Sequence, residues 1–106
     1  RGETDQARRA YRRAIEADSG YAPAWNNLGN LEAAAGRKDT ALACLDRAVT
    51  LDSNYAQAWF NLGFFLFYEG IDTLRAHRGL SKAVSLEPEA HWAGKAREII
   101  KKLEGR

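Results

Sequence analysis

The feature that most constrains this chain is a repeat with a period of 34 residues. The stretch from Ala22 opens with Ala-Pro-Ala-Trp-Asn-Asn-Leu-Gly, and the stretch from Ala56 opens with Ala-Gln-Ala-Trp-Phe-Asn-Leu-Gly. Trp25 and Trp59 therefore hold the same place in two consecutive units. A fixed period of this length is the sequence signature of an array of stacked, similar units.

The repeat divides the chain into four segments. Residues 1–21 match the second half of a unit, and residues 22–55 form one complete unit. Residues 56–90 form a third unit with one inserted residue, and residues 91–106 do not continue the repeat. We expect the insertion between Ile71 and Arg75, because turns accept extra residues more readily than packed helices do.

Each unit carries two apolar patterns of helical period, separated by a glycine. Helices are expected over residues 23–35, 39–51 and 56–69, with a further helix beginning near Asp72. Gly36 and Gly70 suit the left-handed position that follows a helix. Asp39 is expected to cap its helix, and Thr4 or Asp5 is expected to cap the first one. The sequence thus predicts an all-α fold of paired antiparallel helices.

The last segment predicts an amphipathic helix that covers the end of the array. Its apolar residues share one stripe, and charged residues occupy the rest of the surface. A stacked array needs such an end piece, because its last unit otherwise exposes the surface that stacks. The stripe consists of Trp92, Ala93, Ala96, Ile99, Ile100 and Leu103.

The residues that recur in the repeat carry a resemblance to a known family. They are Trp25, Leu28, Gly29, Gly36, Ala41, Leu45 and Ala48 in the complete unit, and Trp59, Leu62, Gly63, Gly70, Ala76, Leu80, Ala83 and Pro88 in the next. This pattern resembles the tetratricopeptide repeat over residues 1–90, with Ser53 in place of the usual proline. The resemblance implies an α-solenoid of about two and a half repeats, closed by a C-terminal capping helix.

Composition and charge exclude several partners. The 16 basic and 14 acidic residues are interspersed and leave a net charge of +2, so we expect neither a nucleic acid nor a membrane as partner. Cys44 is the single cysteine. It excludes an internal disulfide and favours a reducing compartment such as the cytoplasm.

No arrangement of residues indicates catalysis. His77 and His91 fall on different helices and have no metal ligands at suitable spacing. The chain has no glycine-rich phosphate loop. The acidic residues stand mostly beside bases four positions away, as Glu98 does with Lys102, which predicts solvated helix faces. We therefore expect no catalytic residue, no metal, no cofactor and no enzymatic activity.

Asparagines mark the first helices of the units. Asn26, Asn27 and Asn30 lie on one of them, and Asn61 on the next matches Asn27. A side-chain amide both donates and accepts hydrogen bonds, so it can pair with a peptide backbone of any sequence. Neighbouring helices lie about 8–10 Å apart, which is roughly three residues of an extended chain. In the family this slot contacts peptides, and Trp-x-Asn-Leu-Gly is similar to the asparagine ladder of O-linked N-acetylglucosamine transferases. The alternative is that these amides cap or bridge neighbouring helices.

Three phenylalanines form a second candidate surface. Phe60, Phe64 and Phe67 follow the helical spacing i, i+4 and i+7. They either give specificity to a bound segment or are covered by the final helix through Trp92 and Ile99, since an apolar stripe should bind something or be covered.

The clamp for acidic chaperone tails that some family members carry is not expected. It requires lysine and arginine at positions that the resemblance assigns to Asn26, Trp92 and Ala96.

The predicted function is a non-enzymatic scaffold that binds a protein or peptide segment. The binding residues would be Asn26, Asn27, Asn30, Phe60, Asn61, Phe64 and Phe67. Two alternatives remain open. The first is self-association into a homo-oligomer through the repeat end at residues 1–21, and the second is a regulatory arm of a larger enzyme.

Overall fold

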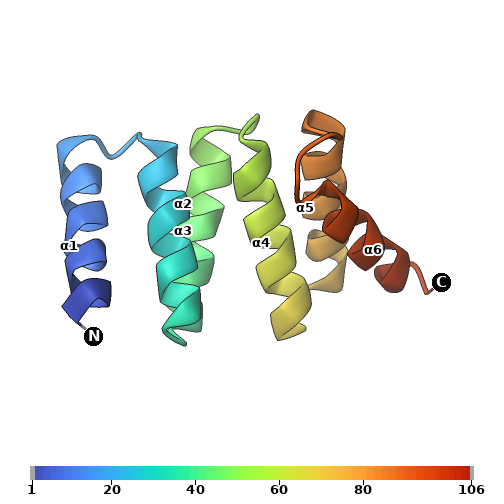
Figure 1. Cartoon of the computed structure of the whole chain (residues 1–106), viewed down its shortest axis with the longest axis horizontal. Coiled ribbons are helices and arrows are strands. Elements are labelled where there is room, and N and C mark those ends of the chain that lie inside the picture. Colours follow the sequence, from blue (N-terminus) through green and yellow to red (C-terminus); the bar gives the residue numbers. More distant parts are fainter. Residues whose placement is uncertain (1, 106) are drawn as a thin grey trace. The chain divides into compact units, whose positions relative to one another are not determined.

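The structure is a computed structural model that describes residues 2–105. In this range the regular structure is helical (Figure 1). The helices are α1 (Gly2–Ala17), α2 (Ala22–Ala34), α3 (Lys38–Leu51), α4 (Ala56–Glu69), α5 (Thr73–Leu86) and α6 (Ala93–Leu103). The chain forms two compact units, of which the first ends at Ser53 and the second begins at Asn54.

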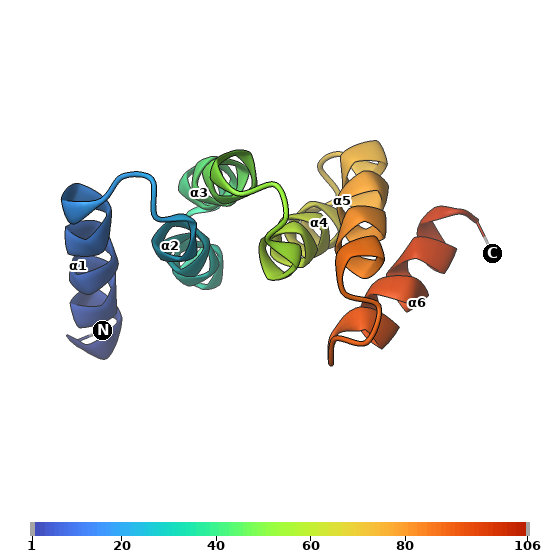
Figure 2. The same cartoon turned by 90° about the horizontal axis from the view of Figure 1, so that it is seen from above.

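The first unit is organised around the pair of α2 and α3, with α1 packed on α2 (Figures 1 and 2). Gly29 sets the distance between the two paired helices. A Cβ atom at this position would lie 2.8 Å from the Leu45 Cγ atom, so only glycine permits this approach. Leu45 is fully buried beneath it.

The second unit repeats this arrangement and adds a helix. Here α4 pairs with α5, and α6 packs against both of them (Figure 2). Gly63 plays the part of Gly29, because a Cβ atom there would lie 2.7 Å from Leu80 Cγ and 3.1 Å from the carbonyl oxygen of Ala76. The apolar face of α6 closes the unit with the buried residues Trp92, Ala93, Ala96 and Ile99.

Glycine ends the first helix of each pair, as the sequence predicts. Gly36 has a φ of 81° and Gly70 a φ of 63°, in the left-handed region that glycine adopts without a steric penalty. After Gly36 a single residue, Arg37, precedes α3. After Gly70 two residues, Ile71 and Asp72, precede α5, so one residue more separates this glycine from the next helix than in the first unit.

Two of the expected caps are wrong. Helix α3 begins at Lys38 after Arg37, so Asp39 lies inside the first turn, where its negative charge still favours the positive end of the helix dipole. Helix α1 already includes Thr4 and Asp5. Asp72 does cap α5, because its carboxylate accepts a hydrogen bond from the Arg75 amide at 3.1 Å.

No helix within residues 2–105 has both the length and the apolar character that a membrane span requires.

Candidate functional site

The asparagines of α2 point in different directions. Asn26 is buried, with 3% of its surface exposed, whereas Asn27 and Asn30 are exposed. Successive residues of an α-helix are about 100° apart, which explains why neighbours differ in this way. Asn26 therefore belongs to the interior, and Asn27 and Asn30 are the asparagines that α2 presents to solvent.

Asn61 lies on α4 at the repeat position of Asn27. It is partly buried and already interacts with a neighbouring group. A ligand at this position would therefore compete with an existing interaction or share the amide with it.

The phenylalanine stripe is partly covered by α6. The rings of Phe60 and Trp92 stack with centroids 5.0 Å apart, and the rings of Phe60 and Phe64 stack at 5.7 Å. Phe67 also packs against the buried cluster under α6. Tyr68 continues the ring series at 5.3 Å from Phe64, and it is 75% exposed. The structure thus brings Phe60, Phe64 and Phe67 together and leaves each of them partly accessible.

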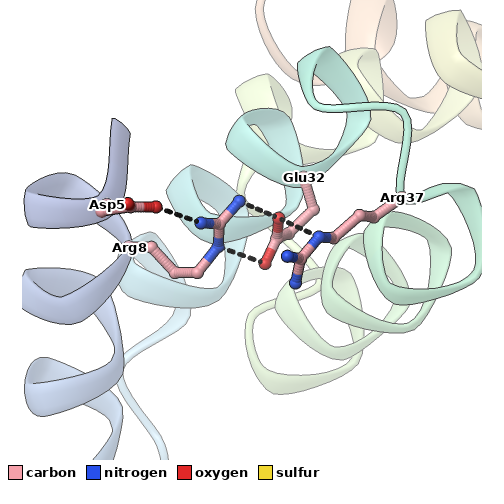
Figure 3. A network of polar contacts seen from close by, with 4 residues as sticks. All are labelled: Asp5, Arg8, Glu32 and Arg37. Atoms are coloured by element: carbon pink, nitrogen blue, oxygen red, sulfur yellow. Dashed lines mark hydrogen bonds and ion pairs between the residues drawn. The ribbon is translucent and has the colours of Figure 1, made fainter. Parts of the chain in front are cut away.

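A polar network that sequence reasoning missed joins α1 to α2 (Figure 3). Glu32 is fully buried, and its carboxylate accepts hydrogen bonds from Arg8 Nη2 at 2.8 Å and from Arg8 Nε at 3.0 Å. Asp5 lies on the other side of the guanidinium, 3.1 Å from Nη1. Arg37, in the turn before α3, approaches the same carboxylate at 4.0 Å.

This network holds Glu32 as an anion. The hydrogen bonds from Arg8 lower the pKa of Glu32 below its ordinary value, against the opposing effect of burial. A carboxylate held in this way is neither an acid nor a base near neutral pH. The expectation of solvated acidic residues is therefore wrong for Glu32. Its repeat counterpart, Leu66, is the signal that could have found it, because an apolar counterpart indicates an interior position.

Other candidate groups form no reactive cluster in the described part of the chain. Among residues 2–105, no group of histidine, cysteine, aspartate and glutamate side chains has the arrangement of a metal site. Burial raises the pKa of the Cys44 thiol, which keeps it protonated at neutral pH. His77 Nε2 lies 2.8 Å from a carboxylate oxygen of Glu104. This contact joins α5 to Glu104, the residue that follows α6.

The family follows from comparison of the sequence with known proteins. Residues 1–56, more than half of the chain, match the family model described as Tetratricopeptide repeat. The chain belongs to the tetratricopeptide repeat family. This membership agrees with the repeated Trp-x-x-Leu-Gly pattern and with the helix pairs on which it lies. Among curated protein sequences, none matches the chain.

Solved structures confirm the fold class, an all-α solenoid of antiparallel helix pairs. The translocator chaperone SycD of Yersinia enterocolitica type III secretion matches with a TM-score of 0.84 and 17% identity, over 97% of this chain and 73% of that one. The same chaperone in complex with a peptide of the translocator YopD matches with a TM-score of 0.85 and 17% identity, over 97% of this chain and 81% of that one. The first tetratricopeptide repeat domain of Spaghetti (RPAP3), bound to the HSP90 peptide SRMEEVD, matches with a TM-score of 0.82 and 21% identity, over 97% of this chain and 82% of that one.

Proposed function

We propose that this tetratricopeptide repeat protein is a non-enzymatic module that binds an extended protein segment. The observation that carries the proposal is the exposure of Asn27 on the first helix of one repeat, with Asn61 at the same position of the next. Two of the similar solved structures hold peptides, from HSP90 and from YopD, which supports a peptide as the class of ligand.

The proposed mechanism is capture of the peptide backbone by side-chain amides. Asn27 and Asn30 can each donate to a backbone carbonyl and accept from a backbone amide. Because both residues lie on a regular helix, their positions are fixed before the ligand arrives, which lowers the entropic cost of binding. Asn26 is buried and is not part of this exposed surface. Phe64 and Phe67, which are partly exposed, supply apolar contacts that distinguish one peptide sequence from another.

The test is selection from a random peptide library, followed by affinity measurements on the double variant Asn27→Ala/Asn61→Ala. The expected result is a set of enriched peptides whose affinity falls at least about tenfold in the variant, which corresponds to about 1.4 kcal/mol. The matched control is Gln6→Ala/Ser85→Ala, which removes two exposed polar groups from α1 and α5. Equal losses in both variants, or an unchanged affinity in the first, would contradict the proposal.

Sedimentation over a wide concentration range separates this function from self-association. A peptide-binding module sediments as a monomer whose mass does not change with concentration. A concentration-dependent dimer that is disrupted by changes in α1 would favour the homo-oligomer instead.

A further inference from the structure

A cationic pocket lies between α4 and α5 of the second unit. Its volume is about 380 Å³, and it is lined by Trp59, Leu62, Arg75, Arg78, Gly79 and Lys82. This volume lies within the range of about 300–1,000 Å³ that is usual for small-ligand pockets. Leu62 and Gly79 are buried residues of this lining, whereas Arg78 and Lys82 are exposed. The pocket therefore combines an apolar wall with positive charge at its opening.

Several residues that line this pocket differ from their counterparts in the first unit. Gly79 takes the place that Cys44 occupies one repeat earlier, and Lys82 takes the place of Arg47. In the first unit Cys44 is buried, and the guanidinium carbon of Arg47 lies 5.8 Å from the centre of the Trp25 ring. The second unit thus has no side chain where the first has the Cys44 thiol, and it has an ammonium group where the first has the Arg47 guanidinium.

Two of the three cations that line the pocket have no counterpart in the first unit. Arg75 and Arg78 stand where the first unit has Thr40 and Ala43. Arg75 already interacts with a neighbouring group. For Arg78 and Lys82, by contrast, the described residues 2–105 contain no ion-pair partner. Like charges three and four positions apart on a helix destabilise it slightly, so an anion in the pocket would relieve repulsion within α5.

We propose that this pocket binds a phosphate monoester that is carried on an apolar or aromatic stem, such as a phosphorylated side chain. A phosphate monoester carries a charge of about −1.5 to −2 at neutral pH, which matches more than one cation. The guanidinium of Arg78 offers the planar pair of donors that phosphate oxygens accept. The rest of the volume, against Trp59 and Leu62, takes the stem, because a bare phosphate would leave this apolar wall uncovered.

This site is separate from the surface of the proposed peptide function. Asn61 follows Trp59 by two residues, which places the two side chains about 200° apart around α4. The ring of Phe60 faces α6, where it stacks on Trp92. The pocket and the asparagines can therefore be tested independently, and failure of either proposal leaves the other intact.

The experiment titrates the intact chain with phenyl phosphate and follows the indole N–H resonance of Trp59 by NMR. Inorganic phosphate and phenol serve as comparison ligands, because the first lacks the stem and the second lacks the charge. We expect phenyl phosphate to bind at least about tenfold more tightly than either. The variant Arg78→Ala/Lys82→Ala should weaken this binding at least tenfold. Both substitutions place alanine at exposed helical positions, which preserves the fold.

Two further variants make the test specific to the pocket. Gly79→Cys installs the residue of the first unit and keeps every charge. A Cβ atom at Gly79 would lie 3.4 Å or more from its nearest neighbours, so the fold is retained while the pocket is filled and binding falls. Lys95→Ala/Lys101→Ala removes two exposed cations from α6 and should leave the affinity within about twofold.

Three outcomes would overturn the proposal. The first is that the Trp59 resonance does not move, and the second is that inorganic phosphate binds as tightly as phenyl phosphate. The third is that affinity falls equally in the pocket variant and in the α6 variant, which would indicate general attraction of anions to a basic surface.

Discussion

Arg8 and Glu32 form a two-pronged ion pair across α1 and α2, with distances of 2.8 Å and 3.0 Å between the guanidinium nitrogens and the two carboxylate oxygens. The next repeat has Leu66 at the position of Glu32, and both residues are fully buried. The contact of α1 with α2 is therefore made specific by charge at a position where the repeat otherwise uses an apolar side chain.

Removal of the guanidinium should destabilise the first unit. In Arg8→Ala the Glu32 carboxylate, which is fully buried in the parent chain, loses its two closest donors. An unpaired buried charge is strongly unfavourable, and we expect the melting temperature to fall by about 5 °C or more. Thermal unfolding followed by circular dichroism measures the change. A shift of less than about 1 °C would show that Arg37 or water replaces the hydrogen bonds that Arg8 donates to Glu32.

The reciprocal change should be far milder. Glu32→Leu installs the residue found at Leu66 and removes the buried charge altogether. Replacing buried ionic groups with apolar ones is often neutral or stabilising. Arg8 retains Asp5 as a partner at 3.1 Å. The double variant Arg8→Ala/Glu32→Leu should therefore be more stable than Arg8→Ala, and the opposite order would contradict this account.

Acid should weaken the same contact. The pKa of Glu32 is lowered in the folded protein, so ionised Glu32 contributes stability at pH values above its ordinary pKa of 4.5. That contribution is lost as the pH falls through 4.5 and then through the lower folded value. Melting temperatures between pH 7 and pH 3 test this. The parent chain should lose more stability over the range than Glu32→Leu, which has no proton to take up at this position.

The two glycines that face each other in the second unit should respond differently to alanine. At Gly63 a Cβ atom would lie 2.7 Å from Leu80 Cγ and 3.0 Å from the backbone nitrogen of Leu80. The backbone cannot move aside cheaply, so Gly63→Ala should cost about 1–3 kcal/mol, as overpacking does.

Gly79→Ala is the matched control for this prediction. Its Cβ atom would make ordinary contacts at 3.4 Å and beyond. Alanine is favoured over glycine in a helix by up to about 1 kcal/mol, so this variant should be neutral or slightly more stable. Chemical denaturation of both variants gives the comparison. Equal destabilisation would show that the crossing of α4 and α5 does not depend on the contact at Gly63.

The repeat made most of the fold predictable. Because Trp25 and Trp59, and then Gly36 and Gly70, recur at one spacing, the sequence alone predicts the helix pairs and their ends. The caps at Asp39 and Asp5 were wrong for a physical reason. A carboxylate in the first turn of a helix is favoured by the dipole whether or not it caps, so the residue type alone does not fix the boundary.

The candidate site was less predictable, because the repeat period does not determine which side chains point to solvent and which point to the interior. Asn26 and Asn27 are the same residue type at adjacent positions, yet Asn26 is buried and Asn27 is exposed. The role of Glu32 depends on Arg8, which lies 24 residues earlier in the chain. Long-range pairs of this kind leave no periodic signal, and only the apolar residue at the matching repeat position indicates them.

The stack of Trp92 on Phe60 should hold α6 in place. Trp92 is 6% exposed and lies in the buried cluster of the second unit. Trp92→Ala should therefore cost about 3–5 kcal/mol, as truncation of large aromatic residues does. Hydrogen exchange should accelerate in α6 and remain slow in α2 and α3. Tyr68→Ala is the control, because Tyr68 is 75% exposed and contributes mainly its stack on Phe64. It should cost no more than about 1.5 kcal/mol.

A double-mutant cycle decides between the two roles that the sequence leaves open for Phe60. If the ring serves to hold α6, then Phe60→Ala and Trp92→Ala should be coupled by about 0.5–1.5 kcal/mol, because stacked aromatic pairs contribute this much beyond their buried area. Phe60→Ala would then weaken the unit even when no ligand is present. A coupling energy near zero, together with a loss of peptide affinity in Phe60→Ala, would instead assign the ring to the ligand and leave α6 held by Ala93, Ala96 and Ile99.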